Sequence, residues 1–368
     1  MKIAGIIAEY NPMHTGHMYQ LNQSNADAKV IVMSGNFVQR GEPALWDKWT
    51  RAKIAIENGA DLVLELPVSF AVASAERFAL GGVSILARLG VITHLIFGAE
   101  NPLPELMQAA DTLSGEAFDL YIKQNANAEK PYHEIRNELV NPDLLKGSNN
   151  ILGIEYLKAI KKLGATLLPE VILRKGAVYN QKIAVDGFAS ASFIRDVLQK
   201  NADCSSYLPY PLPEIKKVTA EDMFSHLKYK LLTEDISEIA EVREGIENRI
   251  KECILSAESF EDLLNKIKTR RYTRTAISRM LTLAFLGIKK HDLSNAPQYT
   301  RVLAANQTGC ELLNKMRKSA DIPIITKGAD GLDFPDFALD VRAGDLYALL
   351  QGSPLRSDFE KHPYIYKK

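Results

Sequence analysis

Five short apolar segments alternate with amphipathic stretches through the first half of this 368-residue chain. The segments are rich in Val, Ile and Leu and end at Gly, Pro or a charged residue, which is typical of buried strands. They read KIAGIIA, VIVMSG, ADLVLELP, HLIFGAE and PEVILRK. Helical patterns lie between them, over residues 16–28, 43–58, 74–89, 149–163 and, less regularly, 104–145. Such alternation predicts a parallel α/β sheet covered on both faces, with ligands bound at the carboxyl ends of its strands.

A proline-rich stretch divides the chain. The segment SYLPYPLPEIKK carries Pro209, Pro211 and Pro213, which leave no room for a regular helix. We therefore predict one domain over residues 1–208 and a second region over 209–368. The second region is expected to be mainly helical, with a small mixed α/β tail in which RVLAAN and IPIITK form strands around a helix.

Composition indicates an ordinary intracellular protein. Basic and acidic residues are equal at 45 each, so net charge points to no partner. The three cysteines lie far apart and lack metal-ligand spacing, which favours a reducing compartment. The longest uncharged stretches are about half of the roughly 20 residues that span a bilayer. We expect a cytoplasmic protein with no membrane segment and no obligate protein partner.

Two histidines stand where the first strand gives way to a helix, in EYNPMHTGHMYQL. His14 and His17 could be satisfied by backbone groups, could bind a metal, or could bind phosphate. A metal site would need a third ligand, which no Cys or His cluster supplies. The phosphate interpretation is favoured, because Pro12 fixes the turn, Gly16 leaves the backbone open and a helix start offers N–H groups to an anion. Histidines three apart on a first helical turn would donate to one phosphoryl group.

The run His14-Thr15-Gly16-His17 resembles the H-x-G-H motif of the nucleotidyltransferase superfamily. That resemblance implies a Rossmann-like sheet and attack on the α-phosphate of a nucleoside triphosphate. A second motif is then expected at a later helix start. The segment ASASFIRDVL fits it, with Ser190 or Ser192 as the helix cap and Arg195 in the first turn. An ordinary capped helix with an exposed arginine is the alternative for this segment.

Further segments resemble the bacterial tRNA(Met) cytidine acetate ligase family. In order along most of the chain they are MSGNFVQRGEPA, DLVLELP, FGAE, NNILGIEYLKAI, RRYTRTAISRMLTLAFLGI and PIITK. The resemblance implies an ATP-dependent ligase that activates acetate as acetyl-adenylate. Its product would be N(4)-acetylcytidine at the wobble position of elongator tRNA(Met). Mg²⁺ is expected with the triphosphate, although no ligands can be assigned to it.

The same resemblance implies the site residues. Catalytic roles fall to His14, His17 and Arg195. The ATP contacts are Ile7, Ala8, Glu9, Tyr10, Asn11, Pro12, Met13, His14, Thr15, Gly16, His17, Met18, Tyr19, Gln20, Gly98, Asn150, Arg174, Lys175 and Ser192. Met13 and Thr15 depart from the Phe and Asn that are common in the family. Gln39 and Arg40 are further candidates, although an exposed loop arginine is ordinary.

The expected chemistry agrees with these residue types. Acetate is ionised at neutral pH, so its attack on phosphorus needs no general base but does need neutralisation of the developing charge. Histidine, arginine and backbone amides provide that neutralisation. The second step, acylation of the cytosine amine, releases a proton whose acceptor cannot be identified from the sequence.

Residues 266–290 carry eight basic side chains and no acidic one. On one helix, Arg270, Arg271 and Arg274 would share a face that tracks phosphates, and Tyr272 would stack on an unpaired base. The predicted tRNA contacts are Lys268, Arg270, Arg271, Tyr272, Arg274 and Arg279. The alternative is a solvated basic face that pairs with the acidic residues in 234–247.

Two other functions fit part of the sequence. An adenylyltransferase of coenzyme synthesis would share the first domain, but a small acceptor needs no long helical region. A tRNA-binding protein without catalysis would share the basic stretch, but it would have no need of His14 and His17. The sequence therefore predicts a Rossmann-like nucleotidyltransferase domain followed by a mainly helical tRNA-binding region.

Overall fold

The computed structural model describes residues 1–125, 132–174 and 187–367, and its centre is a parallel sheet. Five parallel strands run in the order β5-β2-β1-β6-β7. Their bounds are β1 Ile3–Ala8, β2 Ala28–Ser34, β5 Leu62–Leu66, β6 His94–Ala99 and β7 Leu168–Leu173. All five predicted strands are present, so the predicted α/β class is confirmed.

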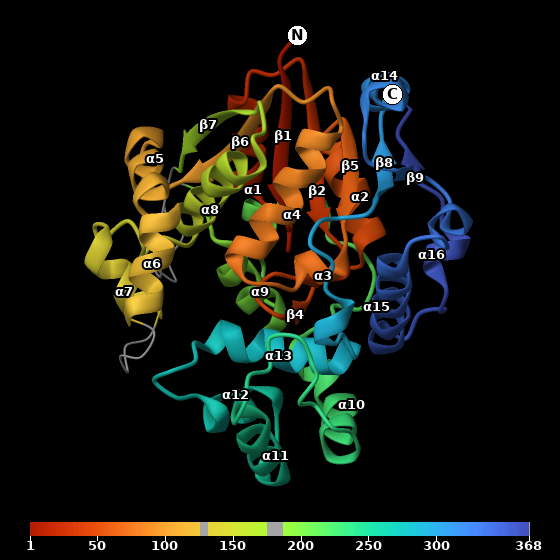
Figure 1. Cartoon of the computed structure of the whole chain (residues 1–368). Helices are drawn as coiled ribbons and strands as arrows, with labels where there is room; N and C mark the ends of the chain where they lie inside the picture. Colours follow the sequence, from red (N-terminus) through yellow and green to blue (C-terminus); the bar gives the residue numbers. More distant parts are fainter. Residues whose placement is uncertain (126–131, 175–186, 368) are drawn as a thin grey trace.

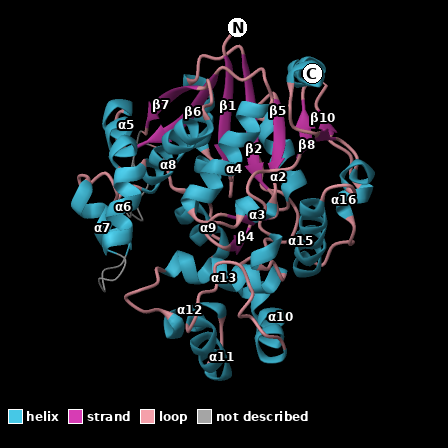
Figure 2. Cartoon of the chain, in the orientation of Figure 1, coloured by secondary structure: helices cyan, strands magenta, loops and turns pink. Residues whose placement is uncertain are grey.

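Helices cover both faces of this sheet (Figures 1 and 2). One face carries α4 (Ala75–Arg88) and α8 (Ser148–Leu163), and the other carries α1 (Thr15–Gln23), α2 (Lys48–Glu57) and α9 (Ala191–Gln199). Alternate residues of β1 supply the two cores, because successive side chains of a strand point to opposite faces. Ile3 and Ile7 enter one core, whereas Ala4 and Ile6 enter the other. The irregular pattern over 104–145 forms separate helices, α5 (Leu103–Thr112), α6 (Glu116–Asn125) and α7 (Tyr132–Leu139).

A helical region packs below the carboxyl ends of β1, β2 and β5 (Figure 1). Its helices are α10 (Ala220–Thr233), α11 (Ile246–Ser256), α12 (Phe260–Ile267) and α13 (Arg274–Leu286). Their apolar faces form a core of their own. This core also takes in Phe37 from the strand β3 (Phe37–Val38) and Val68 from the short helix α3 (Val68–Ala71). The helical region is therefore joined to the sheet by shared apolar packing.

The tail of the chain returns to the first sheet, which corrects one part of the predicted organisation. Strand β8 (Thr300–Ala305) pairs antiparallel with β5, and β9 (Ile324–Ile325) and β10 (Tyr364–Ile365) pair with β8. Between them lie α14 (Gln307–Ser319), α15 (Pro335–Gln351) and α16 (Ser357–Glu360). The sequence indicated these strands but not their partner, since an apolar strand does not encode which sheet edge it joins. The boundary between residues 208 and 209 stays a prediction.

A small hairpin connects the sheet with the helical region. Strand β3 pairs antiparallel with β4 (Glu42–Pro43), and the turn between them reaches α13. The carbonyl of Gly41 accepts hydrogen bonds from the hydroxyls of Ser278 (2.6 Å) and Thr282 (2.7 Å). Gly41 has φ of 77°, and a Cβ there would collide with the backbone of Arg279. Only glycine fits this contact.

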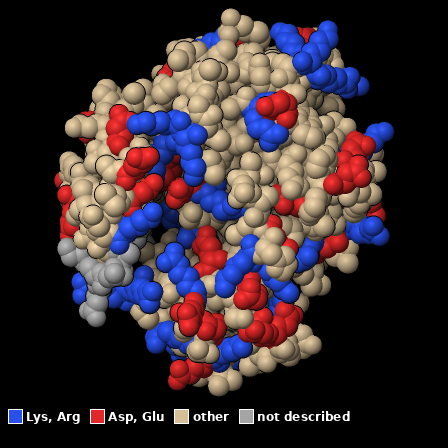
Figure 3. Space-filling view, in the orientation of Figure 1, with Lys and Arg blue, Asp and Glu red and all other residues tan. Residues whose placement is uncertain are grey.

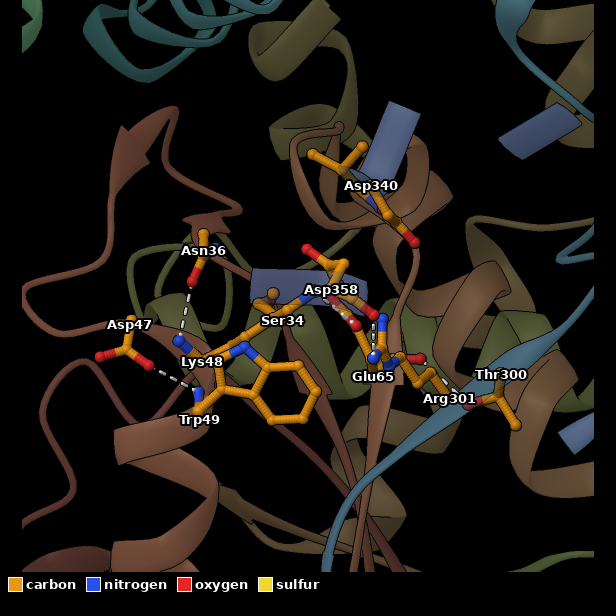
Figure 4. Close-up of polar contacts among 12 residues, drawn as sticks. Ser34, Asn36, Asp47, Lys48, Trp49, Glu65, Thr300, Arg301, Asp340 and Asp358 are labelled. Atoms are coloured by element: carbon orange, nitrogen blue, oxygen red, sulfur yellow. Dashed lines mark hydrogen bonds and ion pairs between the residues drawn. The ribbon is translucent and has the colours of Figure 1, made fainter. Parts of the chain in front are cut away.

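Four buried charges hold the tail against the sheet (Figure 4). The Nζ of Lys48 donates to Glu65 at the end of β5 (2.7 Å) and to Asp358 on α16 (2.6 Å). Arg301 on β8 also donates to the Asp358 carboxylate, at 2.6 Å. Burial disfavours the charged form of Lys48, but the carboxylates of Asp358 and Glu65 outweigh it and raise the pKa of Lys48. Two cations thus face two carboxylates, and a buried network of this kind is costly to break.

Replacement of Asp358 should therefore lower the free energy of unfolding. In Asp358→Asn, two buried cations share one carboxylate, and we expect the free energy of unfolding to fall by about 3 kcal/mol or more. The matched control is Asp143→Asn, which removes one half of an exposed ion pair with Lys146 and should cost less than about 1 kcal/mol. Denaturant unfolding of both variants measures the difference. Equal midpoints would show that the buried network does not stabilise the tail.

Candidate nucleotide site

The two histidines lie at the carboxyl end of β1, where α1 begins. His14 is the N-cap of α1, and its Nδ1 accepts a hydrogen bond from the Gly16 amide at 3.0 Å. His17, in the first turn, accepts from the His14 amide through its own Nδ1, at 3.2 Å. Because each Nδ1 is an acceptor, each ring carries its proton on Nε2. The two Nε2–H groups are therefore the free donors at this helix start.

The two imidazoles are neutral. Their ring centroids lie 3.8 Å apart, with the planes tilted by 31°. Burial lowers the pKa of His17 to about 3, and the nearby charge of Arg174 contributes to this shift. The pKa of His14 is also lowered well below its ordinary value, by burial, by His17 and by Arg174. At neutral pH the pair donates hydrogen bonds without carrying charge.

Gly16 makes room for the His14 ring. A Cβ at this position would lie 2.8 Å from Cε1 of the His14 ring. The absence of a side chain thus allows the imidazole to fold back onto the helix and cap it. The role expected from the sequence, admission of a nucleotide to the backbone, stays a prediction.

The second motif lies against the first. Helix α9 is capped by Ser190, whose Oγ accepts from the Phe193 amide at 3.2 Å, and Ser192 lies beside that cap. Arg195 donates to the carbonyl of Asn11 at 2.8 Å and forms an ion pair with Glu42 of β4 at 2.8 Å. A guanidinium has five N–H donors, so these contacts leave others for a phosphate. The structure therefore brings the two predicted motifs together.

Gly98 and Arg174 lie on the other side of the histidines. Gly98 is in β6 and Arg174 directly follows β7, where its amide donates to the Ala99 carbonyl at 3.0 Å. A Cβ on Gly98 would meet Arg174 only at 3.8 Å, an ordinary contact. Burial is the main cause of the lowered pKa of both histidines, and the charge of Arg174 contributes to it. Lys175 lies outside the described residues.

Asn150 is committed to protein contacts. Its Oδ1 accepts from the amides of Glu100 (2.9 Å) and Asn101 (3.1 Å), and its Nδ2 donates to the Asn101 side chain at 2.9 Å. The carboxylate of Glu100, which the sequence did not single out, in turn accepts from Asn149 at 2.7 Å. The side chain of Asn150 is 1% exposed. It holds the turn after β6 in place, and its contact with ATP stays a prediction.

The remaining residues of the first motif divide between core and edge. The side chains of three of these residues, Ile7, Tyr10 and Met13, are buried. The ring of Tyr10 packs on His17, with the centroids 5.0 Å apart. Met18 and Tyr19 pack against the core on the α1 face, and Gln20 donates to Ile96 at 3.4 Å.

Among the side chains that the structure describes, no group of three His, Cys, Asp or Glu is placed to hold a metal ion. The structure thus adds no ligands for the expected Mg²⁺. No helix in the described part of the chain is long and apolar enough to span a membrane.

The basic segment departs from the predicted helix. Helix α12 ends at Ile267 and α13 begins at Arg274, so Lys268 to Thr273 form the loop between them. Because the polar residues before Arg274 are not helical, no helix face is shared by Arg270, Arg271 and Arg274. Arg274 pairs with Glu261.

Two other predicted RNA contacts are partly occupied. Arg279 forms an ion pair with Glu241 at 2.8 Å, and its side chain is 11% exposed. This pair is the contact that the alternative interpretation of the segment predicted. Tyr272 packs partly against the helical core, and the guanidinium of Arg271 lies 5.8 Å from its ring centre. Lys268 and Arg271 are exposed.

Comparisons with known proteins agree with this geometry. The model of the HIGH Nucleotidyl Transferase family matches residues 1–362. A tRNA(Met) cytidine acetate ligase of Clostridium novyi is 36% identical, and one of Clostridium perfringens is 37% identical; both alignments cover 100% of each chain.

Two solved structures are also similar over their full length. Thermotoga maritima TmcAL in its apo form has a TM-score of 0.91 and 29% identity, with 100% of both chains covered. The same protein bound with alpha-thio ATP has a TM-score of 0.89 and 30% identity, again with 100% of both chains covered. This chain therefore belongs to the HIGH nucleotidyl transferase family and, within it, to the tRNA(Met) cytidine acetate ligases.

Proposed function

We propose that the protein activates acetate with ATP as acetyl-adenylate and acetylates the exocyclic amine of the wobble cytidine in elongator tRNA(Met). The observation that carries this proposal is the pair of neutral imidazole donors at the start of α1, in a chain that is full-length similar to relatives named for this activity. A tRNA substrate implies that the reaction takes place in the cytoplasm.

In the first step, a carboxylate oxygen of acetate attacks the α-phosphorus of ATP, and pyrophosphate leaves. The Nε2–H groups of His14 and His17 would donate to the α-phosphate oxygens as negative charge builds on them. Arg195, beside the first motif, is suited to the β- and γ-phosphates. Preorganised donors of this kind are worth more in an enclosed site than in water. Mg²⁺ would be carried by phosphate oxygens and water, as is usual with nucleotides.

In the second step, the cytosine amine attacks the acetyl carbonyl and AMP leaves. The base must be turned out of the anticodon loop, which an unpaired loop permits at low cost. This face of the molecule is hollowed between α6 and α13, and Lys and Arg side chains lie at the rim together with Asp and Glu side chains (Figure 3). The α12–α13 loop, with exposed Lys268 and Arg271, is suited to meet the RNA backbone there.

The direct test is incorporation of labelled acetate into tRNA. Purified protein, ATP, labelled acetate and tRNA should produce N(4)-acetylcytidine at the wobble position, seen by mass spectrometry of the digested tRNA. Omission of ATP should abolish the product. Absence of product, together with efficient nucleotide transfer to a small phosphate ester, would instead favour a coenzyme adenylyltransferase.

The histidines should be required for the first step. Loss of either Nε2–H donor is expected to slow acetate-dependent exchange of pyrophosphate into ATP by about 10²- to 10³-fold. His14→Asn is the preferred variant, because asparagine still caps the helix but cannot reach the phosphate. His17→Ala and the control His362→Ala, on an exposed loop residue, complete the set. Normal exchange in His14→Asn and His17→Ala would remove both rings from the mechanism.

The α12–α13 loop should affect only the second step. In Lys268→Ala and Arg271→Ala, we expect a higher KM for tRNA and a salt dependence weakened by about one counterion for each phosphate that the variant no longer binds. Acetate-dependent exchange without tRNA should not change. Lys318→Ala, on the exposed surface of α14, is the matched control. If the loop variants bind tRNA as the control does, the RNA follows another path.

A further inference from the structure

The turn of the β3–β4 hairpin is held from both sides. Helix α13 holds it through the two hydroxyl contacts to the Gly41 carbonyl. On the sheet side, the amide of Gln39 donates to Oε1 of Glu9 at 2.7 Å, and the Gln39 side chain donates to the Ala73 carbonyl at 3.0 Å. The residue between them, Arg40, therefore starts from a fixed backbone.

The Arg40 guanidinium has no committed partner. It is half-buried, and among the described residues no hydrogen bond or ion pair engages it. Its charge nevertheless lowers the pKa of Glu9. By contrast, Arg195 is held by Glu42 and Asn11. A half-buried guanidinium on a fixed backbone, without an anion or acceptor, is the arrangement expected of a binding group.

Glu9 is the carboxylate whose pKa the charge of Arg40 lowers. It directly follows β1, five residues before His14, and it is half-buried with one oxygen used by Gln39. Burial raises the pKa of Glu9, and the charges of Arg40 and Arg195 oppose that rise only in part. The charged or titratable groups that act on Glu9, or on which it acts, are Arg40, Glu42, Arg51, Tyr156 and Arg195.

A carboxylate together with a guanidinium matches one edge of a nucleobase. Cytosine presents an amine donor at C4 beside acceptors at N3 and O2, so a carboxylate accepts from the amine while a guanidinium donates to the acceptors. Uracil presents an oxygen at C4, which would face the carboxylate with two acceptors in contact. The anionic carboxylate is, for the same reason, a poor partner for triphosphate oxygens.

We propose that Glu9 and Arg40 form the acceptor-base subsite, in which Glu9 receives the proton of the cytosine amine and Arg40 holds the N3 and O2 edge. This proposal rests on the proposed function. The amine nitrogen forms a bond to the acetyl carbon, and the bond between that carbon and the phosphate oxygen breaks. AMP leaves with the bonding pair, and one amine proton passes to the Glu9 carboxylate, which then releases it to water.

The location supports this assignment. Glu9 shares the carboxyl end of β1 with the histidine pair, so an adenylate formed there lies near its carboxylate. The hairpin that carries Arg40 lies between that edge and α13 (Figure 1). A base that enters from the helical region would therefore meet Arg40 and Glu9 before it reaches the acetyl group.

The test separates the two half-reactions. In Glu9→Gln, acetyl transfer to tRNA should fall by about 100-fold or more relative to any loss of acetate-dependent pyrophosphate exchange. Trapping of the acetyl group by hydroxylamine as acetohydroxamate, which needs no such base, should fall no further than pyrophosphate exchange does. Transfer by the unsubstituted protein should be lost as pH falls through the raised pKa of Glu9, and this dependence should be absent in Glu9→Gln. The matched control is Glu311→Gln on exposed α14, at the opposite edge of the sheet.

Arg40→Ala provides an independent variant, because it breaks no hydrogen bond or ion pair among the described residues and leaves Glu9 in place. It should lower kcat/KM for tRNA by about tenfold, and any loss of hydroxamate formation should be smaller than that. Equal losses of exchange and transfer in Glu9→Gln, or no loss of either, would overturn the subsite. Failure of the unsubstituted protein to use acetate would instead overturn the proposed function, so the two failures can be told apart.

Discussion

Two hydrogen bonds, from the backbone to Nδ1 of His14 and of His17, determine what this site can do. They fix the tautomer of both rings, and burial keeps both rings uncharged. An imidazole that caps a helix with one nitrogen must present the other nitrogen as a donor. The H-x-G-H spacing follows from this geometry. The glycine gives the first ring room, and the second histidine stands at the helix position that reaches back to the cap.

The helical region is connected to this site through the hairpin turn. The hydroxyls of Ser278 and Thr282 hold the Gly41 carbonyl, and the same turn contacts Glu9 through Gln39. Helix α13 is therefore linked to the end of β1 through a few hydrogen-bonded groups. The glycine is essential to this connection, because any side chain would separate the hairpin from α13.

Most of the sheet could be predicted from the sequence, because buried parallel strands are continuous apolar runs between turn residues. The pairing of β8 with β5 could not, since it depends on the tail returning over more than half of the chain. The motifs at His14 and Arg195 were visible as helix starts. Glu42 and Glu100 were not, because a carboxylate that pairs with a site residue looks like any surface acid until the fold places it.

The basic residues in 266–290 also show that the sequence does not reveal which charges will be paired. The number of basic residues in 266–290 predicted a phosphate-binding helix. In the structure, some of these side chains have acidic partners and others are exposed. Arg274 and Arg279 have acidic partners on neighbouring elements, whereas Lys268 and Arg271 lie exposed on a loop. Residues 266–290 contain no acidic residue, but acidic residues from elsewhere in the chain contact them. The partners of Arg274 and Arg279 are Glu261 and Glu241.

The low pKa of the histidines has a consequence for catalysis once ATP is bound. A triphosphate brings several negative charges, and nearby negative charge raises the pKa of an imidazole. Imidazoles with an ordinary pKa would then be protonated, and they would act as acids close to the leaving pyrophosphate. Burial and Arg174 lower the pKa of both histidines before ATP binds. The rings can therefore remain neutral donors when the bound triphosphate raises their pKa. Burial, with a contribution from Arg174, therefore keeps the histidines uncharged.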